Sequence, residues 1–214
     1  ECQTSSDYAL FNLDDPLVAP LRQQAKARRL GFTRTGTLPR DLAGGTYLAG
    51  DRIMTTVTGQ TQEVCRRSEM KIIGSHNVDN AMVAATFALV SGCGLNEIRQ
   101  VLKEFPGLEH ALEVVRERRG IRFINDSKGT NVDATLKALE SIDQPIWLIA
   151  GGRDKGGDFS RLRAAILQRV KRLILIGEAA PLIAKAVQGY QAIEQAKTLK
   201  DAVELAAGQA DAGD

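Results

Sequence analysis

One short stretch, residues 123–131 with the sequence FINDSKGTN, holds the densest group of reactive side chains in the chain. Asp126, Ser127, Lys128 and Thr130 place a carboxylate, two hydroxyls and an ammonium around one glycine. An ammonium on a flexible stem suits a phosphate or a carboxylate ligand. These residue types are therefore those expected of an anion-binding site, although an ordinary strand-to-helix loop uses the same types as caps.

The elements that would position these side chains are a strand, a polar loop and a helix N-terminus. Apolar and polar residues alternate in 121–124, and apolar residues recur at helical spacing after 131. The polar loop between them, residues 125–131, is here called the first loop. Thr130 or Asn131 can cap the helix, and Asp133 resembles the acidic member of a capping box. Exposed backbone N–H groups and the positive end of the helix dipole would both favour an anion there.

A second polar loop, residues 151–158, follows an apolar run; its glycines allow close backbone approach and its Lys155 supplies a cation. Strand and helix patterns alternate around it, which predicts an α/β fold with a parallel, doubly wound sheet. Ligands of such sheets bind beyond the carboxyl ends of the strands, so both loops could face one anionic ligand. The expected elements are a hairpin at 113–124 around Arg119-Gly120, strands at 145–150 and 173–176, and helices at 159–170, 181–187 and 199–207 with Val203 inward.

The first half of the chain predicts an α/β body that carries an antiparallel patch. Residues 46–57 alternate with period two around Gly50-Asp51, which predicts a hairpin, and 62–73 can add another strand. Pro16 suits a helix start with Asp15 as its cap and an apolar face behind it. Other expected elements are strands at 8–11 and from 31, a long helix capped by Ser75, and a helix at 96–103 with Ile98, Val101 and Leu102 inward.

Two amide side chains, Asn77 and Asn80, are expected on one face of the first turn of the helix that Ser75 caps. Two amides on one face can pair with the donors and acceptors on the edge of a base. Plain N-terminal capping is the simpler interpretation of either residue alone.

The composition is typical of a soluble globular protein, with 43% hydrophobic and 25% charged residues. A net charge of +2 argues against a nucleic-acid partner. No apolar run reaches the roughly 18 residues that a membrane span needs. The three cysteines form no CxxC pair, so they indicate neither a disulfide framework nor a zinc site and favour a reducing cytoplasm.

Four motifs taken together resemble the Mur ligase family: His76-Asn77-x-x-Asn80, His110-x-x-Glu113, the first loop, and Gly151-Gly152-x-Asp154-Lys155. They occur in order over essentially the whole chain, and the Asp-Ser-Lys-Gly-Thr-Asn run favours the D-glutamate-adding members. The resemblance implies the C-terminal part of a central ATP-binding α/β domain over 1–107. It implies most of a Rossmann-like C-terminal domain over 108–214, with a boundary near the FPGL sequence at 105–108.

The resemblance also implies an activity, that of an ADP-forming amide ligase of peptidoglycan synthesis. ATP, with Mg²⁺, would phosphorylate the carboxylate of UDP-N-acetylmuramoyl-L-alanine, and the amine of D-glutamate would attack the acyl phosphate. Six residues match ligand-binding positions of the family: Asn77 and Asn80 near the adenine, Asp126 at the ribose, Lys128 near the phosphates as the catalytic cation, and Thr130 and Lys155 at the D-glutamate carboxylates.

Three departures from the family accompany the resemblance. The 214 residues contain no G-x-x-x-x-G-K-[ST] phosphate loop, and we expect that loop, the Mg²⁺ ligands and a carbamylated lysine outside this chain. The family's closing C-terminal segment is also missing, and Ala111 stands where the family has Arg. We therefore expect a fragment that cannot catalyse the reaction alone.

Other functions compete with this interpretation. A non-catalytic nucleotide-binding module would keep the same fold, and a sister Mur ligase or a folate-polyglutamylating ligase would share the motifs. A nicotinamide-dependent oxidoreductase is disfavoured, because no G-x-G-x-x-G follows a strand.

Overall fold

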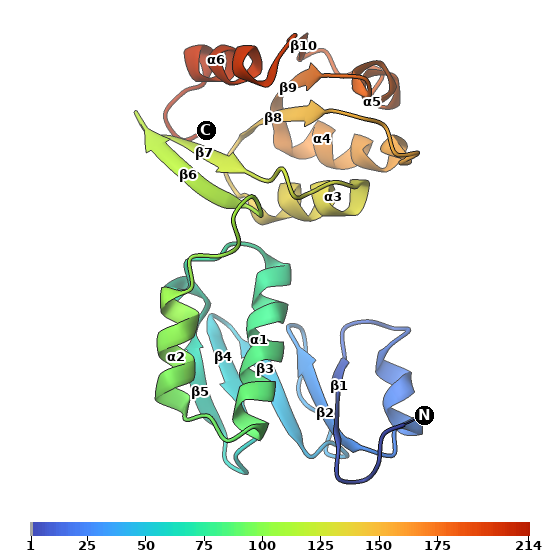
Figure 1. Cartoon of the computed structure of the whole chain (residues 1–214), viewed down its shortest axis with the longest axis vertical. Coiled ribbons are helices and arrows are strands. Elements are labelled where there is room, and N and C mark those ends of the chain that lie inside the picture. Colours follow the sequence, from blue (N-terminus) through green and yellow to red (C-terminus); the bar gives the residue numbers. More distant parts are fainter. Residues whose placement is uncertain (1) are drawn as a thin grey trace. The chain divides into compact units, whose positions relative to one another are not determined.

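The computed structural model describes residues 2–214, which divide into two compact units, Glu1–Pro106 and Gly107–Asp214 (Figure 1). Within the described residues, no helix is both long enough and apolar enough to cross a membrane. Each unit has its own sheet and its own buried core.

The first unit is a five-stranded sheet covered by two helices. Its elements are β1 (Tyr8–Asn12), the 3-10 helix η1 (Ala19–Gln24), β2 (Arg28–Thr33), β3 (Gly44–Ala49), β4 (Arg52–Thr55), β5 (Gln62–Arg66), the 3-10 helix η2 (Arg67–Glu69), α1 (Ser75–Val90) and α2 (Leu95–Glu104). The strands lie in the order β1-β2-β3-β4-β5. Helices α1 and α2 cover one face of the sheet (Figure 1), and Ile53, Val64 and Met82 are fully buried in the core.

The antiparallel patch predicted for this unit is confirmed. Strands β1, β2 and β3 are parallel, whereas β3, β4 and β5 pair antiparallel. Ala49 pairs with Arg52 across the predicted turn, and Gly50 has a φ of 61° there. A tight hairpin turn requires this left-handed conformation, which costs glycine nothing sterically.

The prediction of an amphipathic helix from Pro16 onward is wrong. Oδ1 of Asp15 does accept hydrogen bonds from the N–H groups of Leu17 (2.8 Å) and Val18 (3.1 Å), but the chain continues as a turn and then as η1. Pro20 has no N–H to donate to the carbonyl four residues earlier, which disfavours a continuous α-helix. The predicted apolar face consequently turns outward, and Leu17 is 82% exposed.

Two details of the long helices also differ from expectation. The N-cap of α1 is Gly74, with a φ of 99°, so Ser75 is the first helical residue and not the cap. On α2, Ile98 and Leu102 are buried as predicted, but Val101 is 63% exposed. A helix turns by about 100° per residue, which carries position 101 off the buried stripe defined by positions 98 and 102.

The second unit combines a parallel three-stranded sheet with a separate antiparallel hairpin. Its elements are β6 (Glu113–Arg118), β7 (Ile121–Asn125), α3 (Val132–Ser141), β8 (Ile146–Gly151), the 3-10 helix η3 (Phe159–Leu162), α4 (Arg163–Arg169), β9 (Val170–Ile176), α5 (Ala180–Ala186), β10 (Ile193–Gln195) and α6 (Leu199–Gln209). The parallel sheet has the order β10-β9-β8.

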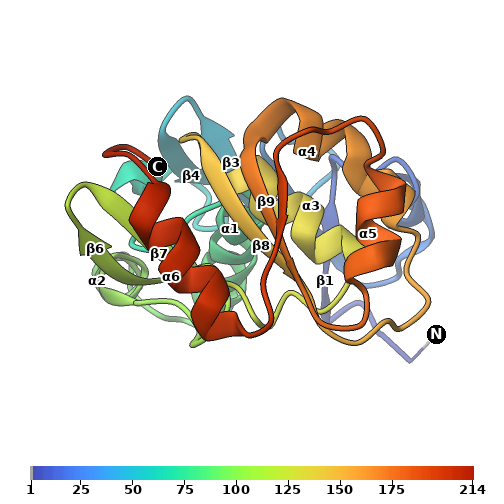
Figure 2. The same ribbon diagram turned by 90° about the horizontal axis from the view of Figure 1, so that it is seen from above.

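Helices cover both faces of the parallel sheet, which confirms the predicted α/β, doubly wound class. Leu173 and Leu175 of β9 pack with side chains of α3, α4 and α5, whereas Ile174 packs with α6. In Figure 2, α6 lies on one side of strands β8 and β9, whereas α4 and α5 lie on the opposite side. Alternate residues of one buried strand therefore belong to two separate cores, as expected when both faces are covered.

Some elements of this unit were predicted incorrectly. The three-residue strand β10 was missed, because the sequence IEQ has no apolar run. The helix predicted over 159–170 is divided into η3 and α4, and its last residue, Val170, begins β9. On α6, Ala202 is buried, but Val203, which was predicted to face inward, is 37% exposed.

The predicted hairpin of β6 and β7 is confirmed, and the last residues of the chain close on it. Arg119 and Gly120 both have positive φ in its turn, and the Arg122 N–H donates to the Asp214 carbonyl (3.0 Å). The Asp214 carboxylate accepts from Trp147 Nε1 of β8 (3.0 Å) and Lys171 Nζ of β9 (2.8 Å). These bonds tie the hairpin to the parallel sheet.

Acid should weaken the second unit through Asp214. Burial raises the pKa of this carboxyl, but hydrogen bonds from Lys171, the Asp211 N–H and Trp147 outweigh it, so the net pKa is lowered. A carboxylate with a depressed folded pKa contributes stability above its unfolded pKa, and that contribution is lost as pH falls through the folded pKa.

The measurement is urea unfolding at a series of pH values, followed by the fluorescence of Trp147, the single tryptophan of the chain. We expect stability to fall below about pH 4 and to fall less steeply in Asp214→Asn. The same acid dependence in both proteins would contradict this assignment.

Candidate functional site

The first loop, which joins β7 to α3, is closed by hydrogen bonds that its backbone N–H groups donate. The four consecutive N–H groups of residues 127–130 all have acceptors within the unit, at 2.8–3.0 Å. In order, these acceptors are Asn125 Oδ1, His110 O, Asp126 O and Lys128 O. The expectation of exposed backbone donors at these positions is therefore wrong, and recognition of an anion by residues 127–130 depends on side chains.

At the start of α3, a side chain caps one of the N–H groups of the first turn. Asn131, one of the two predicted caps, accepts a hydrogen bond from the Ala134 N–H with its Oδ1 (2.8 Å). The predicted capping box does not form, because Asn131 is the N-cap and the third helical residue is then Ala134; Asp133 pairs with Arg161. A carboxylate in the first helical turn also interacts favourably with the positive end of the helix dipole.

A turn at residues 110–113 holds the first loop from its other side. Asp126 Oδ1 accepts from the Leu112 N–H (3.0 Å), and Asn125 Nδ2 lies 2.8 Å from His110 Nδ1. An amide nitrogen only donates, so Nδ1 accepts in this contact and the ring proton lies on Nε2. His110 and Leu112 have φ values of 67° and 46°, which are uncommon for residues with side chains. Two motifs that are separate in the sequence thus form one hydrogen-bonded structure.

Three side chains of this structure remain available to a ligand. Lys128 and Thr130 are exposed, and among residues 2–214 no carboxylate lies within ion-pair distance of the Lys128 ammonium. Asp126 is half-buried; its Oδ1 is held by the backbone, and its Oδ2 makes no hydrogen bond within the described chain. An ammonium can bind phosphate, and a carboxylate oxygen can accept from a sugar hydroxyl.

The second loop packs closely against its neighbours at two of its four glycines. Gly151 has a φ of 142°, and a Cβ there would stand 1.8 Å from the Ile176 carbonyl oxygen. A Cβ at Gly157 would lie 3.3 Å from Cγ2 of Val132, the first residue of α3. The second loop therefore lies beside the end of the first loop (Figure 1), as predicted. Lys155 is exposed, with no ion pair to any described residue.

Sequence reasoning missed Arg161, which joins η3, after the second loop, to α3, after the first loop. Its Nη2 lies 2.5 Å from Asp133 Oδ1, and this hydrogen bond is the main cause of the raised pKa of Arg161. The two residues are separated by 28 positions. No local pattern connects charges so far apart, and the pair could be found only once α3 and η3 were packed.

Asn77 and Asn80 lie together in the first turn of α1, as predicted. Asn80 Nδ2 donates to Asn77 Oδ1 (3.3 Å), and Asn77 Nδ2 donates to the Ile73 carbonyl (2.8 Å). Neither side chain accepts a helix N–H, so the simpler interpretation as N-terminal caps is wrong. Between them, burial raises the pKa of Asp79, which pairs with Arg34 at 2.7 Å.

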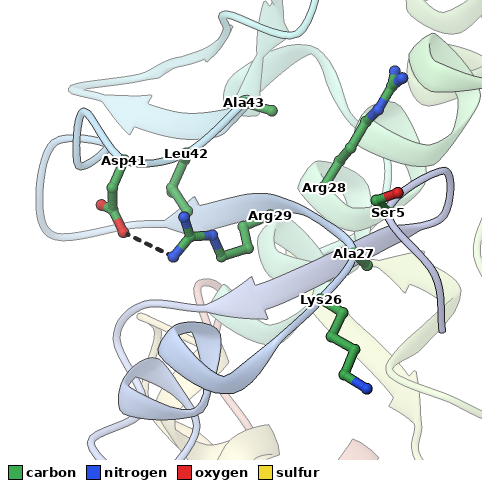
Figure 3. Close-up of a pocket in the computed structure, with 8 residues that line it drawn as sticks. All are labelled: Ser5, Lys26, Ala27, Arg28, Arg29, Asp41, Leu42 and Ala43. Atoms are coloured by element: carbon green, nitrogen blue, oxygen red, sulfur yellow. Dashed lines mark ion pairs between the residues drawn. The ribbon is translucent and has the colours of Figure 1, made fainter. Parts of the chain in front are cut away.

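A shallow groove of the first unit is lined by residues other than Asn77 and Asn80. Figure 3 shows it at the amino ends of β2 and β3, where Arg29 reaches toward Asp41 (3.7 Å) and Lys26 points away. The cations around it do not converge on one point, and none of the six predicted site residues lines it. Within residues 2–214, no group of three or more His, Cys, Asp or Glu side chains could hold a metal ion.

Comparison with known proteins gives the class of this fold. Residues 112–214 match the family described as Mur ligase, glutamate ligase domain. The crystal structure of MurF from Acinetobacter baumannii has a TM-score of 0.66 at 19% identity, covering 94% of this chain and 45% of that one. Residues 112–214 therefore form a Mur ligase C-terminal domain.

Two curated relatives carry the same name. A protein of Pelotomaculum thermopropionicum named UDP-N-acetylmuramoylalanine–D-glutamate ligase is 40% identical over 99% of this chain. A protein of the same name from Desulfitobacterium hafniense strain Y51 is 42% identical over 100% of it. The chain spans about half the length of these relatives, 46% and 47% respectively.

Proposed function

We propose that this chain is part of an ATP-dependent, ADP-forming ligase that joins D-glutamate to UDP-N-acetylmuramoyl-L-alanine. The observation that carries the proposal is the exposed Lys128, held on a closed loop beside the loop that bears Lys155. Two cations on adjacent loops, neither paired with a carboxylate of residues 2–214, suit a reaction that involves phosphates and carboxylates. The names of relatives at about 40% identity support the same activity.

The nucleotide contacts are proposed residue by residue. In the first unit, the amides of Asn77 and Asn80 would pair with the adenine edge, since Asn80 is exposed and its Oδ1 has no partner in the described chain. In the second unit, Asp126 Oδ2 would accept from a ribose hydroxyl, and Lys128 would lie near the phosphates. Bound ATP would supply the phosphoryl group that activates the carboxylate.

The amino-acid contacts are proposed for Thr130 and Lys155. D-glutamate carries two carboxylates, and an exposed hydroxyl and an exposed ammonium on adjacent loops could each bind one. An acyl phosphate and the tetrahedral species that follows both spread negative charge, which a positioned cation stabilises. We assign this catalytic role to Lys128. We expect the Mg²⁺ ligands outside these 214 residues.

The experiment that tests the proposal is calorimetric titration of the purified chain with ADP. We expect binding that Asn80→Ala and Lys128→Ala both weaken, because each removes a proposed nucleotide contact. A folded chain that binds ADP equally well in both variants would contradict the assignment. The chain has no phosphate loop, so we also expect no ligation by the 214 residues alone, and measurable ligation would overturn that expectation.

Ala111 gives a further prediction, because a methyl group cannot clamp a phosphate as a guanidinium can. The test uses a chimera in which this chain replaces the matching stretch of the Pelotomaculum thermopropionicum relative. Ala111→Arg should lower the KM for ATP about tenfold, the scale of one charge-assisted hydrogen bond. Ala207→Arg, on the exposed side of α6, is the control. An unchanged KM for ATP would show that another group already compensates.

A non-catalytic nucleotide-binding module is the second candidate. Ala111 and the lack of a phosphate loop in these residues favour it. The two functions differ in one result: a module would bind ADP and yet leave the chimera without D-glutamate-dependent ADP formation.

A further inference from the structure

An ion pair joins the two helical elements, α3 and η3, that follow the loops carrying the proposed ligand groups. Asp133 lies three residues after Thr130, in the first turn of α3, and Arg161 lies six residues after Lys155, in η3. Their side chains meet at 2.5 Å. Each partner is therefore anchored in a helical element directly behind one of the two proposed carboxylate-binding residues.

Both ends of this bridge are fixed locally. Asn131 caps α3 through the Ala134 N–H, so the turn that holds Asp133 is ordered by its own cap. Asp158 caps η3: its Oδ1 accepts from the Ser160 N–H (3.1 Å) and the Ser160 hydroxyl (2.5 Å). These bonds lower the pKa of Asp158 and keep its carboxylate charged.

An apolar contact supports the same junction. Val132 is buried in the core of the second unit, and Gly157 approaches its Cγ2 so closely that any side chain would have to displace it. Phe159 packs against the same core. The second loop is thus held to α3 on one side by apolar packing and on the other by the Asp133–Arg161 pair.

We propose that Asp133 and Arg161 form a positioning pair that fixes the spacing between Thr130 and Lys155, and thereby the site for the two carboxylates of D-glutamate. The pair is 70% and 51% exposed and adds little to global stability, because water screens exposed ion pairs. The pair acts instead on the geometry of the site, because the two carboxylates of D-glutamate must reach two protein groups at a fixed separation. This inference rests on the proposed function.

Hydrogen exchange in the 214-residue chain tests the coupling directly. Two amides report on the loops: the Thr130 N–H, bonded to the Lys128 carbonyl, and the Gly156 N–H, bonded to Asp154 Oδ1. Arg161→Gln should accelerate exchange at both by about fivefold, since local opening becomes easier. Asp133→Asn should do the same, and the double variant should be no faster than either, because both changes remove one interaction.

A matched control lies on the same helix. Lys137 and Glu140 form an equally exposed ion pair at 3.1 Å that stays within α3. Lys137→Gln should leave exchange in both loops unchanged, and Arg161→Lys should restore most of the protection. Additive effects of Asp133→Asn and Arg161→Gln, or unchanged exchange in both, would overturn the inference.

Kinetics of the chimera give the second readout. Arg161→Gln should raise the KM for D-glutamate about tenfold and leave kcat within about twofold, the signature of lost binding common to ground and transition states. A change in kcat alone would argue against a positioning role. If the unmodified chimera shows no D-glutamate-dependent activity, the proposed function fails, and hydrogen exchange still decides whether the pair couples the loops.

Discussion

Lys128→Ala should reduce D-glutamate-dependent ADP formation by the chimera by about 10²–10³-fold in kcat, the cost of losing one preorganised group at a developing negative charge. The reason is local. Lys128 is the exposed cation of the first loop, and none of the residues described by the structure forms an ion pair with it. Its backbone is held by the His110 carbonyl, so the ammonium extends from a fixed base.

Two variants make this test specific. Lys137→Ala removes an exposed lysine from α3, which follows the first loop, and should leave kcat unchanged. Lys128→Arg keeps the charge but replaces a compact ammonium with a planar fork, so we expect intermediate activity. A kcat for Lys128→Ala within about fivefold of the unmodified value, on the scale of a surface contact, would exclude the catalytic role.

Gly151→Ala should destabilise the second unit by roughly 3–5 kcal/mol, a large share of the stability of a small domain. Gly151 has a φ of 142°, outside the regions that residues with side chains adopt readily. The added Cβ would also stand 1.8 Å from the Ile176 carbonyl oxygen, which belongs to the backbone of the neighbouring strand β9 and cannot rotate away.

Urea unfolding followed by Trp147 fluorescence measures this effect, because that tryptophan lies in β8 and reports on the second unit. Gly208→Ala is the control. Gly208 lies in α6 with open space where its Cβ would be, so the change should stabilise the helix by about 0.5–1 kcal/mol. Equal urea unfolding midpoints for Gly151→Ala and Gly208→Ala would contradict the close approach of Gly151 in β8 to Ile176 in β9.

The fold class was predictable because its signals are local. Alternating strand and helix patterns after residue 145 indicate a doubly wound sheet, and period two over 46–57 indicates a hairpin; both are observed. The errors in the predicted elements have two local causes: a residue that cannot make a helical hydrogen bond, and a strand too short to show a pattern. Pro20 interrupts the helix expected from Pro16, and the three residues of β10 are too few to give a pattern.

Lys128, Thr130 and Lys155 stay predicted site residues, chosen from their types and from the loops that carry them. The structure shows that these side chains are exposed and that Gly157 of the second loop lies close to Val132, directly after the first loop. Two features of the candidate site could be found only from the folded structure. The N–H groups of the first loop are satisfied internally, partly by the His110 carbonyl, and Asp133 pairs with Arg161 across 28 positions.

The central claim is that this chain carries the nucleotide-binding and amino-acid-binding residues of a D-glutamate-adding ligase. The most direct test is ADP formation by the chimera, with UDP-N-acetylmuramoyl-L-alanine and ATP present, as D-glutamate is added. We predict ADP formation that saturates with D-glutamate and is lost in Lys128→Ala. A folded chimera that forms ADP equally with and without D-glutamate, or that forms none, would contradict the claim.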